Sequence, residues 1–327
     1  LAKRHKFAQL SGFVNGVLRN IARNIDSVQL DTLSIRYSMP QWIVDRFVAA
    51  YGEKKAEEIF KAFHNKSTIS IRTNLTRCTP DELRAMLEAE GVTVTAVDEL
   101  DYAFVISGFD YLNGLQSFRD GLFYVQDISS MLVAQTAAPK KGDYVIDVCA
   151  APGGKSTHIA ELLQGSGHVL ARDLTDNKVG MIEENIDRHG LNNMSAEVWD
   201  ATVPDADSAE KADILICDLP CSGLGVLGRK KDIRYKMTPE SVDELAALQR
   251  QILDTVHTYV KPNGVLVYST CTIDEAENED NVRWFIEKHP EFELDKSFAE
   301  GTGMKQILPG EHGSDGFFIA RFIKSKL

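Results

Sequence analysis

Two cysteines directly follow apolar segments, at positions where a thiol can act in catalysis. Cys221 follows an apolar segment in the run DLPCSG at 218–223, and Cys271 follows another in STCT at 269–272. A thiolate that adds to C6 of cytosine makes C5 nucleophilic toward a methyl donor, which divides one difficult step into two easier ones. Asp218 is placed to hydrogen-bond or protonate N3 of that base, and Cys221 to help release the product. The pair therefore favours pyrimidine methylation over two buried structural cysteines.

The nucleophile needs an environment that favours the thiolate, because an ordinary cysteine is only a few per cent ionised at neutral pH. Thr272 to Glu275 has the pattern of a capping box, so we predict that a helix begins directly after Cys271 and stabilises its negative charge. The acidic run 274–280 is then interpreted as the exposed face of that helix. Cys217, Cys221 and Cys271 contain no C-x-x-C pair, and no metal site is predicted.

A second set of candidates lies in the turn DVCAAPGGKS at 147–156. A phosphate-binding P-loop needs glycine where Cys149 stands, and the G-x-G-x-x-G spacing of dinucleotide-binding folds is absent. A turn of small residues at a helix start remains, followed by Asp173 at the end of the next strand, where an acid commonly binds ribose hydroxyls. A nucleoside without a pyrophosphate matches this pattern, and S-adenosylmethionine is the common one. Asp200 is placed to bind the adenine edge.

The elements around these residues predict an α/β fold. Short apolar strands alternate with amphipathic helices, at 144–148, 168–173, 195–199, 214–218 and 265–269. This order indicates a doubly wound parallel sheet covered on both faces, which binds ligands at the carboxyl ends of its strands. The length of 327 residues favours more than one domain. We predict an N-terminal helical segment (1–25), a helical linker (26–65), a small α+β module (66–123) and the main α/β domain (124–327).

Charge and composition limit the partners. The net charge is −12, yet 1–25 and 229–236 are basic segments on an acidic chain. These segments are compatible with nucleic acid, and Arg229, Lys230 and Arg234 are the candidate phosphate contacts. The chain has no apolar run of membrane-spanning length, and its five cysteines show no disulfide spacing. A cytoplasmic monomer that binds no membrane is therefore expected.

Together, the segments 147–156, 218–223 and 269–272 resemble RNA 5-methylcytosine methyltransferases. The similarity extends to IRTN at 71–74, YVQD at 124–127 and GSDGFFIAR at 313–321. It implies a Rossmann-like class I methyltransferase that uses S-adenosylmethionine on RNA, with 16S rRNA as the substrate. Cys271 would be the nucleophile, and Cys221 would help release the product. The implied cofactor contacts are Cys149, Ala150, Ala151, Pro152, Gly153, Gly154, Lys155, Asp173, Asp200 and Asp218.

The resemblance also implies roles outside the catalytic domain. The module at 66–123 would bind RNA, with Arg72 and Asn74 among its contacts. Residues 1–25 resemble the end of a helical NusB-like domain whose earlier part this sequence lacks. Where the family usually has Arg-x-Pro-Asp after the first cysteine, residues 229–232 read RKKD, which is expected to loosen the loop over the target base. Two alternatives stay open: a DNA cytosine-C5 methyltransferase, and a non-catalytic RNA-binding factor in ribosome assembly.

Overall fold

The computed structural model describes residues 7–27, 29–65 and 68–326, and the chain divides into compact units at 1–57 and 58–327. The first unit is helical, as predicted, and its helices are α1 (Ser11–Asn24), α2 (Leu33–Arg36) and α3 (Gln41–Tyr51). Gly52 has a φ of +77°, a value that glycine adopts without strain, and it separates α3 from α4 (Glu53–His64). No helix in the described ranges is long and apolar enough to cross a membrane.

The second unit begins with a small four-stranded antiparallel sheet in the order β2-β3-β1-β4. Its elements are β1 (Ile69–Thr73), α5 (Pro80–Ala89), β2 (Thr93–Val97), β3 (Leu100–Ser107), α6 (Gln116–Arg119) and β4 (Phe123–Val125). Thr79 caps α5 by accepting a hydrogen bond from the Glu82 amide, while the Glu82 carboxylate accepts one from the Thr79 amide. Leu83 and Leu87 of α5 are buried with Phe104 of β3 in a separate apolar core.

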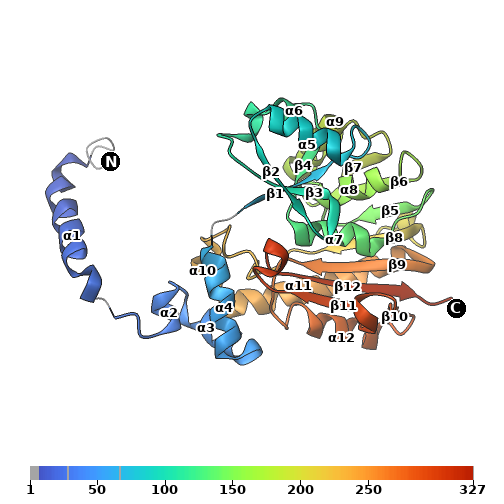
Figure 1. Ribbon diagram of the computed structural model, residues 1–327. Coiled ribbons are helices and arrows are strands. Elements are labelled where there is room, and N and C mark those ends of the chain that lie inside the picture. Colours follow the sequence, from blue (N-terminus) through green and yellow to red (C-terminus); the bar gives the residue numbers. More distant parts are fainter. Residues whose placement is uncertain (1–6, 28, 66–67, 327) are drawn as a thin grey trace. The chain divides into compact units, whose positions relative to one another are not determined.

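A larger, mostly parallel sheet forms the rest of this unit (Figure 1). Its strand order is β10-β12-β9-β8-β5-β6-β7, and β11 pairs with β12. The strands are β5 (Tyr144–Asp147), β6 (His168–Asp173), β7 (Met194–Val198), β8 (Ala212–Asp218), β9 (Val260–Thr270), β10 (Phe292–Leu294), β11 (Met304–Ile307) and β12 (Phe317–Lys324). Strands β5 to β9 are parallel, whereas β12 runs antiparallel to β9. The predicted doubly wound α/β fold is confirmed.

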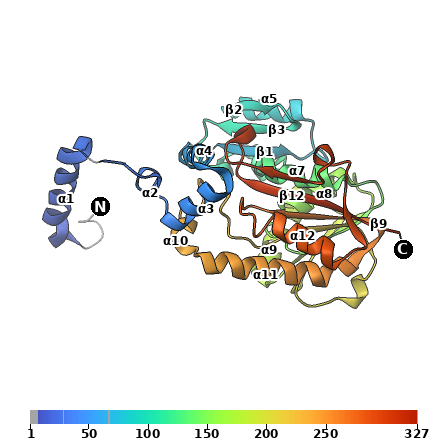
Figure 2. The ribbon, with the colours of Figure 1, turned by 90° about the horizontal axis from the view of Figure 1, so that it is seen from below.

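Both faces of this sheet are buried, because successive side chains of a strand point to opposite faces. In β8, Ile214 and Ile216 join one apolar core, while Leu215 and Cys217 join the other. The first core contains residues of α7 (Ile128–Ala137), α8 (Gly154–Leu162) and α9 (Asp176–His189). The second contains residues of α11 (Pro239–Val256) and α12 (Glu279–Lys288), with α11 running along the sheet in Figure 2. A short helix, α10 (Ile233–Lys236), precedes α11.

A buried ion pair joins the small sheet to the large one. Arg72 on β1 contacts the Glu161 carboxylate on α8, and their side chains are 0% and 1% exposed. The remaining guanidinium donors reach Gln126 Oε1 at 2.9 Å and Thr157 Oγ1 at 3.0 Å. Burial raises the pKa of Glu161 to about 7, although Arg72 opposes that shift. Removing Glu161 would leave the buried Arg72 charge uncompensated, at a cost of about 3–5 kcal/mol.

Candidate active site

A cavity of about 340 Å³ lies at the carboxyl ends of β5, β6, β8 and β9. Strand order reverses between β5 and β8, because the chain continues from β5 to β6 and β7 on one side and returns to β8 and β9 on the other. Ligands bind at such a switch point in doubly wound sheets. The cavity brings together eight of the seventeen residues singled out from the sequence, namely Cys149, Ala151, Asp173, Asp200, Asp218, Cys221, Lys230 and Cys271.

The turn after β5 is fixed by two buried carboxylates. Asp147 accepts hydrogen bonds from the Ser156 hydroxyl and, at 3.4 Å, from the Cys149 amide. Burial raises the pKa of Asp147 to about 7, and the hydrogen bond from Ser156 opposes the shift. Asp173 Oδ2 accepts the Ala151 amide at 2.9 Å. The turn is therefore held to the ends of both β5 and β6 before any ligand binds.

Glycine is required where this turn enters α8. Gly153 has a φ of +102° and occupies the N-cap of the helix. At Gly154, an added Cβ would lie 3.2 Å from the Tyr124 ring. Both positions bring backbone close to neighbouring groups, as expected of a turn that receives a ligand at a helix N-terminus.

The Lys155 side chain extends from this turn to the end of β8. Its Nζ lies 2.7 Å from Asp218 Oδ2, and Ser269 donates to Asp218 Oδ1 at 2.7 Å. Burial alone would lower the pKa of Lys155, but Asp218 raises it above the ordinary value. Asp218 thus accepts one hydrogen bond from the Lys155 ammonium group and one from the Ser269 hydroxyl, an arrangement that suits a hydrogen-bond acceptor more than the proton donor considered from the sequence.

The two cysteines meet at the edge of the cavity. Cys221 Sγ and Cys271 Sγ lie 3.3 Å apart, one after β8 and the other at the end of β9. The hydrogen bond from Cys221 lowers the pKa of Cys271 against the opposing effect of burial, and Lys155 and Lys230 lower it further. The same hydrogen bond, together with burial, raises the pKa of Cys221. Cys271 is therefore the better thiolate and the better nucleophile of the two.

The predicted helix start after Cys271 is wrong. Residues 271–278 form a turn, and α12 begins only at Glu279. The charge on Cys271 is therefore favoured by the Cys221 thiol and two lysines instead of a helix dipole. The acidic run is also not simply an exposed face, because Asp274 and Glu277 are buried.

Glu277 is a positioning residue that the sequence pattern does not indicate. Its carboxylate accepts the Ser222 amide at 2.9 Å, the Ser222 hydroxyl, and Gln249 Nε2 at 3.0 Å. These bonds fix the residue that follows Cys221. No local sequence signal predicts the burial of Glu277. An acidic residue within the run DEAENED at 274–280 is normally expected to be exposed to solvent.

Glu277→Gln is expected to lower the free energy of unfolding by about 1–3 kcal/mol, because the buried hydrogen bonds to Ser222 lose their charged acceptor. Glu275→Gln is the matched control, since the Glu275 side chain is 62% exposed and pairs only at the surface. Its effect should stay below about 1 kcal/mol. Urea unfolding of both variants measures the difference, and equal effects would contradict the positioning role.

Several predicted RNA contacts are buried in the structure. Arg72 and Asn74 are both 0% exposed, and Asn74 Nδ2 donates to the carbonyls of Gly121 and His189. Arg234 is also buried. These residues join elements of the protein, so their direct contact with RNA stays a prediction.

The basic loop is divided between structural and exposed residues. Arg229 contacts Asp127 at 2.7 Å and Asp315 at 2.6 Å, which ties the loop to α7 and to the turn before β12. Lys230 is exposed and lines the cavity beside the cysteines. Of the three predicted phosphate contacts in this loop, Lys230 is the one best placed to meet a nucleic acid at the site.

Known families match both parts of this architecture. The sequence matches the family described as 16S rRNA methyltransferase RsmB/F over residues 134–323. It also matches the ferredoxin-like domain described as Methyltr_RsmF/B-like over residues 39–109. The chain is 38% identical to a Bacillus subtilis protein named "Probable ribosomal RNA small subunit methyltransferase B", over 99% of this chain and 76% of that protein.

Solved structures share the fold. The crystal structure of PH0851 has a TM-score of 0.84 and 32% identity, covering 90% of this chain and 67% of that one. NSun6 from Pyrococcus horikoshii, solved with SFG, has a TM-score of 0.78 and 24% identity, covering 88% of this chain and 99% of that one. The second likeness concerns the fold alone.

Proposed function

The chain belongs to the 16S rRNA methyltransferase RsmB/F family, and from this premise we propose that it methylates C5 of a cytosine in 16S rRNA. The reaction would use S-adenosylmethionine and pass through a covalent bond between Cys271 Sγ and C6 of the base. The observation that carries the proposal is the pair of thiols 3.3 Å apart at the cavity, with the pKa of Cys271 lowered and that of Cys221 raised.

The cavity suits S-adenosylmethionine. Its volume of about 340 Å³ lies within the usual range of small-molecule sites. The glycine turn at the N-terminus of α8 would approach the cofactor closely, Asp173 would bind the ribose hydroxyls and the exposed Asp200 would bind the adenine edge. When bound, the cofactor supplies an electrophilic methyl group. The NSun6 structure was solved with SFG, which is consistent with this assignment.

The protein's own groups account for the remaining steps. The Cys271 thiolate attacks C6, and the C5=C6 electron pair becomes available at C5 to accept the methyl group. Asp218, held by Lys155 and Ser269, accepts a hydrogen bond from the exocyclic N4 amino group of the cytosine and orients the base. Once Cys271 is bonded to C6, its negative charge no longer raises the pKa of Cys221, and the Cys221 thiol can release its proton to water in the cavity. The Cys221 thiolate then removes the proton from C5, after which the C5=C6 bond reforms and the Cys271 thiolate leaves.

The experiment is a transfer assay with a donor labelled in its methyl group. The purified chain is incubated with unmodified 16S rRNA and with DNA of matched sequence, and the labelled nucleosides are identified by mass spectrometry. Label in 5-methylcytidine from RNA alone is expected. Label at another base atom would contradict the C5 assignment, equal label in DNA would favour a DNA methyltransferase, and cofactor binding without transfer would favour a non-catalytic RNA-binding factor.

Lys230→Gln is expected to weaken RNA binding by removing one phosphate contact. Each such contact contributes about −0.7 to the slope of log affinity against log salt concentration on single-stranded RNA, so the slope should become shallower by about that amount. Fluorescence anisotropy with an rRNA fragment at several salt concentrations measures it. Lys231→Gln is the control, because Lys231 is exposed but does not line the cavity. Identical slopes for the parent and Lys230→Gln would contradict the contact.

A further inference from the structure

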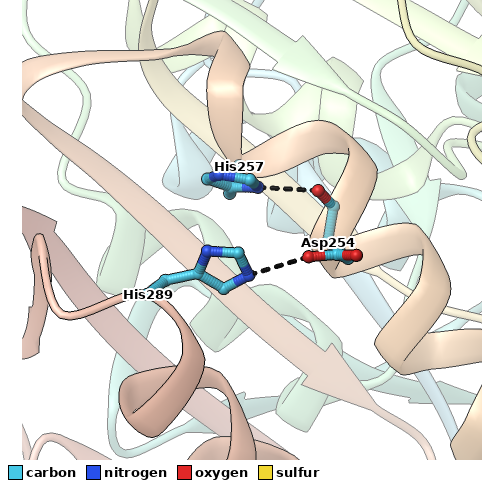
Figure 3. A group of neighbouring side chains, drawn as sticks. All are labelled: Asp254, His257 and His289. Carbon is cyan, nitrogen blue, oxygen red and sulfur yellow. Dashed lines mark hydrogen bonds and ion pairs between the residues drawn. The ribbon is translucent and has the colours of Figure 1, made fainter.

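Two histidines and two carboxylates meet near the ends of α11 and α12, outside the catalytic cavity. Asp254 lies in the last turn of α11, His257 follows that helix, His289 follows α12, and Glu291 precedes β10. Figure 3 shows both imidazole rings beside Asp254, one ring above the other. The ring centroids are 3.9 Å apart. Four side chains that can bind metal ions therefore come from two segments that are distant in sequence.

The spacing of the donor atoms approaches that of a metal site. His289 Nε2 lies 3.2 Å from Asp254 Oδ1, and one donor atom each from Asp254, His257 and His289 can be chosen within 4.8 Å of the others. Ligand atoms on one tetrahedral zinc ion are roughly 3.3 Å apart, given bond lengths of about 2.0–2.1 Å. The first distance matches this value, and no pair of the three chosen atoms needs to close by more than about 1.5 Å.

The hydrogen bonds leave a lone pair available on each ring. His257 Nδ1 lies 2.8 Å from the Asp254 backbone carbonyl, so this nitrogen carries the proton and Nε2 is free to act as a ligand. His289 Nε2 is buried and has no hydrogen-bond partner, because its contact with the Asp254 carboxylate lacks hydrogen-bond geometry. The His289 side chain is only 8% exposed. A buried polar nitrogen without a partner is costly, and a bound cation would remove that cost.

Charged and aromatic side chains surround the two histidines. Lys288 contacts Asp254 Oδ2 at 2.8 Å and leaves Oδ1 directed at His289. Glu291 Oε1 lies 3.7 Å from His257 Nε2 and 3.8 Å from His289 Nδ1. Aromatic rings pack around the histidines, from Trp284, Phe285 and Phe292.

We propose that Asp254, His257 and His289 bind a divalent transition-metal ion of the zinc class. Imidazole and carboxylate donors together suit zinc, whereas magnesium and calcium prefer oxygen alone. The ion would join the end of α11 to the end of α12. Its role would be to stabilise the fold, since none of the three residues lines the catalytic cavity.

The test uses the untagged chain, treated with a chelator and then titrated with Zn²⁺ by calorimetry. Co²⁺ serves as the spectroscopic probe, because its visible bands report tetrahedral coordination. The Cys221 and Cys271 thiols are a competing site for such ions, so the titration is repeated in the Cys221→Ser/Cys271→Ser double variant. Thiolate-to-cobalt absorption in the near ultraviolet marks any binding at the cysteines.

One zinc ion per chain is expected in the double variant, with affinity at least tenfold lower after His289→Gln or Asp254→Asn. At a free-ion concentration of 100 Kd, zinc should raise the ratio of folded to unfolded protein about 100-fold in the parent and much less in these variants. His312→Gln is the control, because His312 is an exposed histidine outside the cluster. Circular dichroism of the metal-free proteins checks folding. Loss of all zinc binding in the cysteine double variant, or unchanged affinity in folded His289→Gln, would overturn the proposal.

Discussion

Cys271→Ala is expected to reduce methyl transfer by roughly four to six orders of magnitude, as loss of a catalytic nucleophile does in other enzymes that act through one. Without the sulfur no bond to C6 forms, and C5 stays too electron-poor to accept the methyl group. Transfer of labelled methyl groups to rRNA at saturating cofactor measures the effect. Cofactor affinity should change little, because the turn after β5 and Asp173 remain in place.

Cys78→Ala provides the matched control for this substitution. Cys78 is a free, buried cysteine of the small sheet's core, far in sequence from either catalytic edge. It should retain catalysis with at most a modest loss of stability. A Cys271→Ala protein that methylates RNA at the parent rate would rule out the covalent mechanism.

Cys221→Ala is expected to accumulate a covalent complex between protein and RNA. Its sulfur lies 3.3 Å from Cys271 and is the group placed to take the C5 proton, so product release should stall after methyl transfer. The adduct should also form more slowly, because removal of the Cys221 hydrogen bond raises the pKa of Cys271. Denaturing gel electrophoresis with labelled RNA detects the complex as a band that survives heating in detergent.

The double variant Cys221→Ala/Cys271→Ala separates this outcome from non-specific crosslinking, since it lacks the Cys271 thiol that forms the adduct. The same gel should show no shifted band for it. A Cys221→Ala protein that completes many turnovers and leaves no adduct would show that another group removes the proton.

The sequence was sufficient to predict the sheet and the meeting of the two cysteines. Each cysteine follows an apolar strand, and the carboxyl ends of neighbouring parallel strands share an edge, so local patterns already determine the juxtaposition. The cavity accordingly contains Asp173, Asp218, Cys221 and Cys271 together.

Contacts between distant segments were not predictable in this way. Arg229 was interpreted as a phosphate contact, yet its partners Asp127 and Asp315 lie about a hundred residues before it and almost ninety after it. The burial of Glu277 was unpredictable for a related reason. Its carboxylate is held by Ser222 and Gln249, and no local sequence pattern connects these two residues to Glu277. The predicted helix after Cys271 failed because a capping pattern is a weak signal where tertiary contacts hold the chain in a turn.

The buried pair of Arg72 and Glu161 has a consequence for how a substrate is chosen. It fastens the small sheet to the helix that begins at the cofactor turn, so the two sheets cannot swing independently without exposing an unpaired charge. An RNA strand bound by the small sheet, as the family resemblance implies, would then reach Cys271 across one fixed distance. That distance would restrict which nucleotide of the strand can reach the sulfur.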